Sequence, residues 1–354
     1  MTYIFGLSYG TLKVKKTEFL KRHDFEEMLR MTSPSDFLSY LGGHGYESDI
    51  SSNSTHYSGF DLVEASNNFH LARMNRTAIS VTPREGRDVV AAYLTKWDIQ
   101  NIKTILVSKN LNLKVEETEM YLISESNVPL GIFAGLLSYS DYKNLLGMVR
   151  VEDIITYLLR YGYGKALLSY LEDYRKSSDL TSLLLSLDLY YYGMMKDKFR
   201  FYSGTEGPIY RFIRGNIDIK NIMTILKFKE FAGDEEVKNY LLPGGTFSEQ
   251  HLEELVKSSS VEEVIQKLKW FADLSKGLDF YKKRGSLAGI EGGLNRGLYR
   301  EFIEILDMSA LSINNVLAYV LRAEAEWMDV RNIALGRYYN IDEETIRMIS
   351  MNMG

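Results

Sequence analysis

The sequence contains no cysteine, only five prolines and only five histidines among its 354 residues. The absence of cysteine excludes disulfide bonds, thiolate metal sites and thiol catalysis, and it fits a reducing compartment. The scarcity of proline favours long helices, because proline interrupts a helix interior. No two histidines have the spacing of ligands on one helix, so we expect neither a metal site nor a bound cofactor.

Long apolar runs and a surplus of positive charge are also missing. The longest apolar stretches, 128–137 and 183–189, are too short to cross a bilayer. The chain opens MTYIFGLSYG, without the basic region and cleavage site of a secretion signal, so we expect none. The net charge is −5, so the chain as a whole does not attract a nucleic-acid backbone or an anionic lipid surface. We expect no nucleic-acid partner, and any work at a membrane would be done from outside it.

The residues that are present indicate helices. Hydrophobic residues make up 45% of the chain and recur at helical spacing, and no alternating stretch is long enough to build a sheet on. We therefore predict an almost entirely α-helical protein, with the Leu/Tyr-rich run at 183–192 in its core. Local capping signals predict four helix starts. One helix begins at Pro34 with Ser33 as its cap, and a second begins at Pro83 with Thr82 as its cap and reaches Val107. A third begins at Pro208, and a fourth follows a cap at Ser312.

Three weaker patterns need an interpretation. Basic residues at 13–22 fall on one side of a predicted helix within 3–22, and we interpret them as a solvated face rather than a binding patch. Gly6–Gly10 matches the Gly-x-Ser-x-Gly pattern of hydrolases but has no strand before it, so we interpret it as a chance match. The glycine-rich segment 285–297 lacks the other parts of a phosphate cradle, so we predict a flexible loop there.

One short pattern occurs three times, each time inside a helical run. An aspartate is followed by an asparagine three residues later, and the three aspartates are 120 and 111 residues apart. A second element, at 25–46, returns at 142–163 with a constant offset of 117. This period is too long for a solenoid repeat and suits a copied domain. We predict three tandem, structurally similar helical domains at 1–127, 128–245 and 246–354. The three pairs are Asp98 with Asn101, Asp218 with Asn221, and Asp329 with Asn332.

Each aspartate–asparagine pair lies on one helix face beside apolar neighbours, because residues three apart face the same way. Polar groups in such a place need hydrogen-bond partners, which the end of a neighbouring helix would supply. We favour this structural interpretation. The functional alternative places three acidic groups around one axis, facing a partner.

The chain resembles the C subunit of the archaeal and bacterial A/V-type ATPases, whose eukaryotic counterpart is the d subunit. Three features carry the resemblance: the Asp-[Ile/Val]-x-Asn-Ile helices, the segment LDLYYY at 187–192, and the closing segment EWMDVRNI at 326–333. The resemblance covers essentially the whole chain. It implies three domains in a pseudo-threefold funnel and a rotor subunit of the central stalk with no catalytic site of its own.

The resemblance also implies the partners. One side of the funnel would sit on the membrane proteolipid (c/K) ring at the cytoplasmic face, and its cavity would receive central-shaft subunits of the D and F type. The protein would then be a peripheral membrane protein in a large hetero-oligomer, linking ATP synthesis or hydrolysis to proton or sodium transport. Lys13, Lys15, Lys16, Arg214 and Lys220 are candidate polar contacts.

Two other classes remain open at this stage. A cytosolic α-helical scaffold with different partners would not associate with membranes that bear an ATPase. An all-α enzyme would show a cavity lined by carboxylates with perturbed pKa values.

Overall fold

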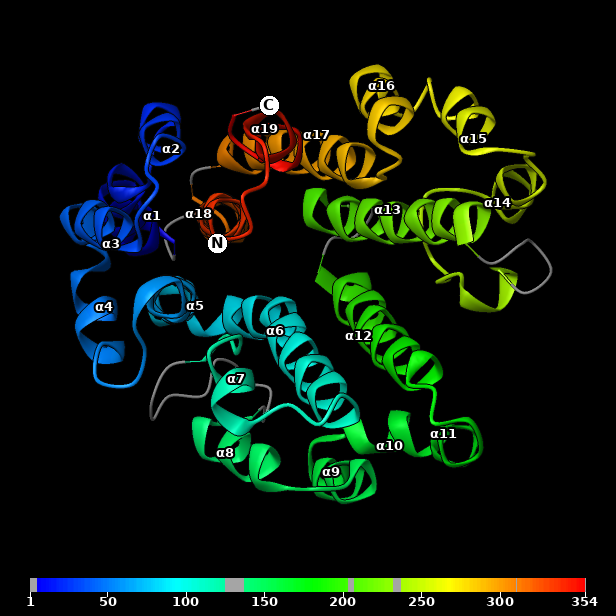
Figure 1. Ribbon diagram of the computed structural model, residues 1–354, viewed down its shortest axis with the longest axis horizontal. Helices are drawn as coiled ribbons and strands as arrows, with labels where there is room; N and C mark the ends of the chain where they lie inside the picture. The colour runs from blue at the N-terminus through cyan, green and yellow to red at the C-terminus, as the bar shows by residue number, and fades with distance from the viewer. Residues whose placement is uncertain (1–4, 125–136, 203–206, 232–236, 310, 354) are drawn as a thin grey trace.

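The computed structural model describes residues 5–124, 137–202, 207–231, 237–309 and 311–353. Every regular element within these ranges is a helix, and the described ranges contain no β-strand (Figure 1). The prediction of an all-α protein is confirmed. The predicted domain boundary at 127/128 lies outside the described residues.

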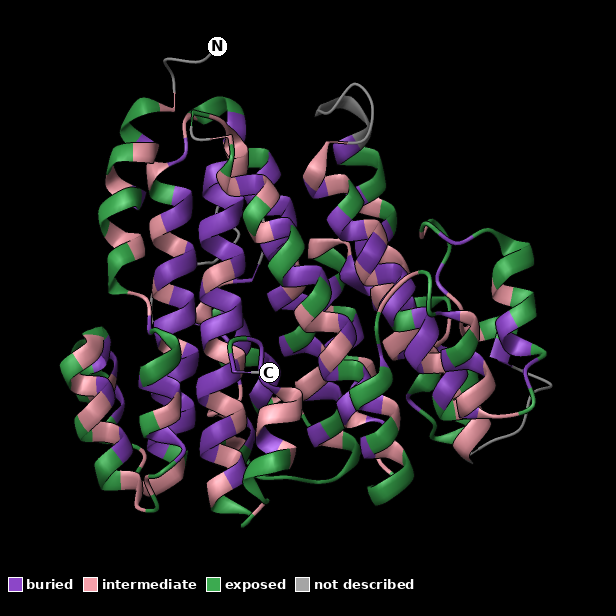
Figure 2. Cartoon of the chain, turned by 90° about the horizontal axis from the view of Figure 1, so that it is seen from above, coloured by how far each residue is buried: buried purple, intermediate pink, exposed green. Residues whose placement is uncertain are grey.

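Six long helices form the frame of the molecule. Each contacts the next in chain order, and the last of them packs against the first, so that the contacts form a closed circuit (Figure 1). Figure 2 shows these helices running side by side, with buried residues along most of their length. The six are α5 (Gly59–Val81), α6 (Arg84–Asn110), α12 (Thr181–Tyr202), α13 (Pro208–Phe231), α17 (Ala288–Asp307) and α18 (Ile313–Tyr338).

Shorter helices surround this circuit on its outer side (Figure 1). They come in groups before each pair of long helices, and α19 follows the last pair. They are α1 (Gly6–Lys15), α2 (Arg22–Met28), α3 (Pro34–Leu41), α4 (Glu47–Asn53), α7 (Val115–Glu119), α8 (Tyr139–Gly147), α9 (Val151–Leu158), α10 (Tyr163–Leu168), α11 (Leu171–Ser177), α14 (Glu249–Val256), α15 (Val261–Lys267), α16 (Ser275–Arg284) and α19 (Glu343–Ile349).

Most of the predicted helix starts are confirmed. The Ser33 hydroxyl accepts the Asp36 amide with Pro34 in the first turn, and Ser312 caps α18 in the same manner. Pro208 is the first residue of α13. The run at 183–192 lies in α12, and its members Leu183, Leu187, Tyr191 and Tyr192 belong to the core, as predicted.

The predicted cap of α6 is wrong, although the helix itself begins at Arg84 and passes beyond Val107. The Thr82 hydroxyl does not accept a bond from α6. It donates instead to the Ala78 carbonyl of the preceding helix, at 2.6 Å. Because α5 ends only one residue earlier, the hydroxyl finds an unpaired carbonyl of that helix first.

The single basic helix predicted within 3–22 is also wrong. Helix α1 ends at Lys15, a 3-10 turn follows, and Arg22 opens a separate helix. The basic residues at 13–22 therefore do not share one face.

The predicted loop at 285–297 is a helix over most of its length, since α17 begins at Ala288. Two of its glycines, Gly289 and Gly292, serve close packing. A Cβ on Gly292 would lie 2.4 Å from the Met348 carbonyl oxygen of α19, and a Cβ on Gly277 of α16 would lie 2.9 Å from the Gly289 carbonyl oxygen. Glycine is needed at these places because the neighbouring backbones leave no room for a side chain.

The element predicted to recur at an offset of 117 does so in its contacts. In both copies a tyrosine hydroxyl donates to the aspartate sixteen residues before it, and a glycine follows with a positive φ, which glycine adopts without strain. The contacts are Tyr40 to Asp24 at 2.7 Å and Tyr157 to Asp141 at 2.6 Å, and the glycines are Gly45 (φ 92°) and Gly162 (φ 88°).

Candidate functional site

A pocket of about 190 Å³ opens where α6, α12 and α13 meet. Its lining combines aromatic rings with charged and amide side chains. The α6 contributors are spaced by three or four residues and so occupy a single helix face. The polar lining residues are Lys96, Gln100 and Lys103 from α6, Asp188 from α12, and Asn216 and Lys220 from α13, and the aromatic ones are Tyr93, Trp97, Tyr191 and Tyr192.

Asp188 holds two lysines of the pocket together. Its carboxylate lies 2.7 Å from the Lys103 ammonium and 2.9 Å from that of Lys220. Burial alone would raise the pKa of Asp188, but the two lysine charges outweigh it and hold this pKa below its usual value. Burial lowers the pKa of Lys103, and the Lys220 charge adds to that effect. One carboxylate thus joins helices α6, α12 and α13.

A second ion pair lies deeper, between Lys96 of α6 and Glu324 of α18, at 2.6 Å. The Glu324 side chain has no exposed surface. The same carboxylate oxygen accepts the hydroxyls of Tyr93, at 2.8 Å, and of Tyr299 from α17, at 2.9 Å. Burial lowers the pKa of Lys96 and raises those of both tyrosines well above the ordinary value. This cluster links α6, on the pocket side of the circuit, to α17 and α18 on the other side.

The repeated asparagines all bind main chain that lies beyond the end of their own helix. Asn101 and Asn221 each donate a hydrogen bond to the carbonyl of one residue and accept a hydrogen bond from the amide of that same residue. The two bonds fix the orientation of the bound residue, as pairing between two β-strands does. The third, Asn332, donates only. The bonds are Asn101 with Ile123 (2.8 and 2.8 Å), Asn221 with Leu242 (2.9 and 2.7 Å), and Asn332 with the Ile349 carbonyl (3.2 Å).

The repeated aspartates also accept main-chain amides from beyond their own helices, a few residues after the asparagine partner in the second and third copies and at Leu137 in the first. Each accepts at least one amide, and burial raises the pKa of all three, that of Asp98 to about 7. The amide donors are Leu137 to Asp98 (3.2 Å), Thr246 to Asp218 (2.9 Å), and Met351 and Asn352 to Asp329 (2.6 and 2.9 Å). Five of the six side chains are buried, Asn332 is half-buried, and none of the six lines the pocket described above.

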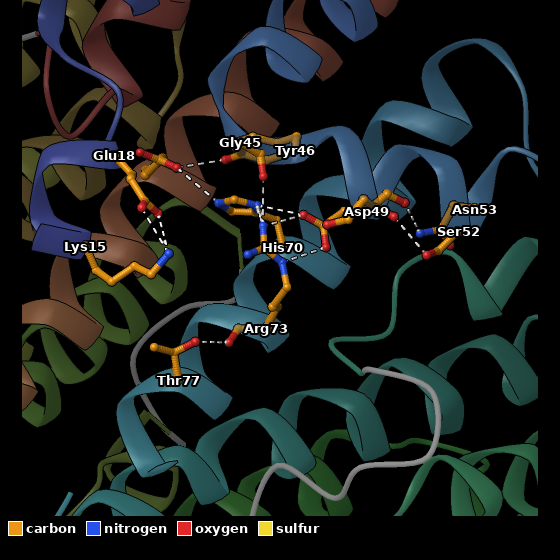
Figure 3. A network of polar contacts seen from close by, with 12 residues as sticks. Lys15, Glu18, Gly45, Tyr46, Asp49, Ser52, Asn53, His70, Arg73 and Thr77 are labelled. Atoms are coloured by element: carbon orange, nitrogen blue, oxygen red, sulfur yellow. Dashed lines mark hydrogen bonds and ion pairs between the residues drawn. The ribbon is translucent and has the colours of Figure 1, made fainter. Parts of the chain in front are cut away.

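A buried polar network on the other side of the molecule was not predicted. His70 of α5 binds Asp49 at 2.8 Å and stacks on the Tyr46 ring, with ring centres 3.6 Å apart (Figure 3). The Tyr46 hydroxyl donates to Glu326 of α18 at 2.9 Å. Burial lowers the pKa of His70 and raises that of Glu326 to about 7.

The other candidate contacts do not line the pocket. Lys15 pairs with its neighbour Glu18 at 2.9 Å, and Lys16 pairs with Asp307 at 2.5 Å. Lys13 lies 5.8 Å from the centre of the Tyr9 ring. Arg214 donates to the Gly245 carbonyl at 2.9 Å. Only Lys220 of the five candidates lines the pocket.

The sequence interpretation missed Lys96, Lys103 and Glu324 as members of a site. A signal for them existed. Helices α6 and α18 are apolar on several faces, so a charged residue inside their buried stretches needs a partner of opposite sign. The sequence could not reveal which partner, because Lys96 and Glu324 are 228 residues apart.

The arrangement offers ion pairing and hydrogen bonding. Ser8 of the Gly-x-Ser-x-Gly pattern lies inside helix α1 and donates to the Val81 carbonyl at 2.6 Å. Within the described ranges, histidine, aspartate and glutamate form no cluster of three that could hold a metal ion. None of the helices in the described part of the chain is long and apolar enough to cross a membrane.

Comparison with known proteins gives a consistent result. The family model of the ATP synthase (C/AC39) subunit matches residues 9–349. The C subunit of the A-type ATP synthase from Thermoplasma volcanium is 34% identical over 346 residues, covering 98% of this chain and 97% of the relative. Its counterpart from Thermoplasma acidophilum is 35% identical over 338 residues, covering 95% of each. The corresponding protein of Haloferax volcanii is 26% identical over 341 residues, covering 95% of this chain and 94% of the relative.

Proposed function

The chain belongs to the C/AC39 subunit family of ATP synthases, and we propose that it is the non-catalytic rotor subunit that links the central shaft to the membrane proteolipid ring. In this role it transmits rotation between the nucleotide-driven head and the ion-driven ring. The coupled processes are ATP synthesis or hydrolysis and the transport of protons or sodium ions. The observation that carries the proposal is the family match over nearly the whole chain.

The closed circuit of long helices supports a mechanical role. A part that transmits torque must resist deformation, and closely packed helices have low compressibility. Here α18 packs back on α5, so the frame has no free edge at which it could unroll. The three aspartate–asparagine pairs lie within α6, α13 and α18 and bind main chain that follows each helix, and we assign them this structural, stabilising role.

The predicted domains fit the same scheme. We propose three similar units at 1–127, 128–245 and 246–354, each contributing one pair of long helices, arranged as a funnel around a pseudo-threefold axis. The contacts repeated at an offset of 117 support the similarity of the first two units.

The pocket between α6, α12 and α13 is our candidate contact for the shaft. It gathers the cations of Lys96, Lys103 and Lys220, and in the described part of the chain these three pair with the two carboxylates of Glu324 and Asp188, which leaves one positive charge in excess. Such a pocket favours an acidic or hydrogen-bond-accepting group on the shaft tip. We propose that shaft subunits of the D and F type occupy this side.

The proteolipid ring is the proposed partner at the opposite end of the rotor. The ring presents short loops, so docking would depend on scattered polar contacts rather than on one deep pocket. Lys13, Lys15, Lys16 and Arg214 are proposed for this class of contact. The protein would then be a peripheral membrane protein at the cytoplasmic face.

The test is recovery of tagged protein from detergent-solubilised membranes that contain an intact ATPase, followed by identification of the bound proteins. We expect the proteolipid together with the shaft subunits. Membranes that lack the protein should hydrolyse ATP without pumping ions, since the head and the ring would be uncoupled. Retained pumping would overturn the proposal, and recovery of neither partner would favour a cytosolic scaffold instead.

A further inference from the structure

A second and larger cavity lies on the molecule away from the pocket of α6, α12 and α13. It is a groove of about 890 Å³ lined by α13, α16 and α17, by Thr246, by the segment 271–274 before α16, and by Met348 of α19. The proposed shaft contact does not use this groove, and Arg214 is the only proposed ring contact that lines it.

Positive charge is in excess along the groove. Two arginines come from α13 and two from α17, so both sides contribute. Arg296 donates to the Ser350 carbonyl at 3.1 Å, and Arg214 donates to the Gly245 carbonyl, so two guanidinium groups are fixed by backbone. Five basic residues face three acidic ones: Arg211, Arg214, Lys276, Arg296 and Arg300 against Asp273, Glu301 and Glu304.

The two outer arginines are available to a partner. Arg211 and Arg300 are exposed, and neither forms a hydrogen bond or an ion pair with any residue that the structure describes. Arginine presents a planar fork of donors that suits carboxylates, and it is common at the centres of protein interfaces. The two residues therefore mark the groove as a receptor for carboxylate groups.

The floor of the groove is suited to a helix. Gly293 and Gly297 lie one turn apart on α17, and an added Cβ on Gly297 would meet no atom within 4 Å. Because neither residue carries a side chain, the α17 backbone itself lines the groove here, next to the largely buried Leu294 and Leu298. A second helix can approach closely where no Cβ intervenes.

An exposed aromatic patch adjoins the groove. Trp270 is 63% exposed, and its ring lies 5.4 Å from that of Phe247 and 5.8 Å from that of Phe271. Phe271 also lines the groove, so patch and groove form one continuous surface. A large exposed ring beside arginines has the composition of an interface hot spot.

We propose that this groove binds an acidic, amphipathic helix of a partner protein. Carboxylates of that helix pair with Arg211 and Arg300, and its apolar face covers Gly293, Gly297 and the Trp270 patch. A small anion would need only the arginines, whereas the open glycine floor and the aromatic patch together fit a longer amphipathic ligand. The proposal is independent of which protein occupies the pocket of α6, α12 and α13.

The test uses the full-length protein and a fluorescent helical peptide of about 20 residues, with leucines on one face and glutamates along its flanks. Fluorescence anisotropy measures its binding. We expect Arg211→Glu combined with Arg300→Glu to weaken binding by about tenfold or more. The same peptide with lysine in place of glutamate should not bind.

Two controls separate binding from folding. Lys282→Glu with Lys283→Glu on the exposed side of α16 should change the affinity by no more than about twofold, because isolated surface charges contribute little. Gly297→Trp should block the groove with an unchanged unfolding temperature, because space is open there. Equal binding of the lysine peptide, or unchanged binding by the Arg211/Arg300 variant, would overturn the proposal.

A photo-reactive benzoylphenylalanine at position 297 identifies which molecule lies in the groove in the assembled ATPase. We expect a cross-link to an acidic segment of another protein of the complex. A cross-link to lipid, or to a second copy of this chain, would show a different occupant and overturn the proposal.

Discussion

The main-chain amides of Leu20 and Leu137, which are 117 residues apart, both donate a hydrogen bond to a carboxylate on a long helix. Leu137 donates to Asp98 of α6 at 3.2 Å, and Leu20 donates to Glu326 of α18 at 2.6 Å. Each leucine directly precedes the N-cap residue of a short helix, which is Lys21 for α2 and Ser138 for α8. The last long helix of the chain thus binds the segment ahead of α2 much as α6 binds the segment ahead of α8, although through Glu326 rather than through Asp329, the repeat counterpart of Asp98.

Replacing Asn221 with alanine should destabilise the protein by about 2–3 kcal/mol, because both groups of the Leu242 peptide would lose their buried partner. The free energy of unfolding in urea measures the effect. Gln266→Ala, on the exposed face of α15, is the matched control and should stay within about 0.5 kcal/mol of the parent. Equal stability of the two variants would contradict a fastening role for Asn221.

Lys96→Met should cost about 3–5 kcal/mol of stability, because it leaves the fully buried Glu324 without its cation. Adding Glu324→Gln should recover a large part of this loss, since no uncompensated charge then remains. A double-mutant cycle with urea unfolding gives the coupling energy. Additive effects of the two substitutions would show that the pair is not coupled.

Two glycines of α17 should respond to alanine with opposite signs. Gly292→Ala should destabilise, because the new Cβ would lie 2.4 Å from the Met348 carbonyl oxygen and push α19 away. Gly297→Ala should stabilise by about 0.5–1 kcal/mol, because alanine is the better helix former and space is open there. Thermal unfolding of both variants tests this, and a shift of the same sign would contradict the close packing of α17 and α19.

Glu326 should make stability fall as pH rises from about 4.5 to 7. Burial raises the pKa of Glu326 to about 7 in the folded protein, from 4.5 in an unperturbed carboxyl. In this window the folded state holds a proton that the unfolded state has released, so raising the pH favours unfolding by up to about 1.4 kcal/mol per pH unit.

The variant Glu326→Gln should remove that contribution. Its stability relative to the parent should therefore improve steadily between about pH 5 and pH 8, as measured by urea unfolding. Glu304→Gln, at an exposed position of α17, should follow the parent in parallel. A Glu326→Gln curve that also runs parallel to the parent would refute the assignment.

Lys220→Glu should weaken binding of the shaft subunits by about tenfold, if the pocket of α6, α12 and α13 is their contact. The substitution replaces one of the three positive charges of the pocket with a negative charge beside Asp188. Lys269→Glu, at an exposed position after α15, is the control. Interferometry with immobilised shaft subunits measures both, and equal affinities would move the shaft contact elsewhere.

The sequence predicted the helical class and the positions of the aspartate–asparagine pairs, because both depend on spacings within one helix. It did not predict the His70 network, because Tyr46 and Glu326 are 280 residues apart and only the folded circuit brings them together. The prediction of a loop at 285–297 was wrong for a different reason. Glycine at every fourth position is typical of a flexible loop and equally of a helix face on which other backbones pack, and only the neighbours distinguish the two.

The bond from Leu20 to Glu326 also sets an order of events during synthesis. The chain segment before α2 cannot reach its final acceptor until α18 has left the ribosome, about 300 residues later, which takes roughly 15–60 s at ordinary elongation rates. During that interval the apolar face of the first helices, which includes Phe25 and Met28, lacks the α18 residues Val330 and Ile333 that cover it in the finished protein. Nascent chains stalled before α18 should therefore depend on chaperones in a way that the completed chain does not.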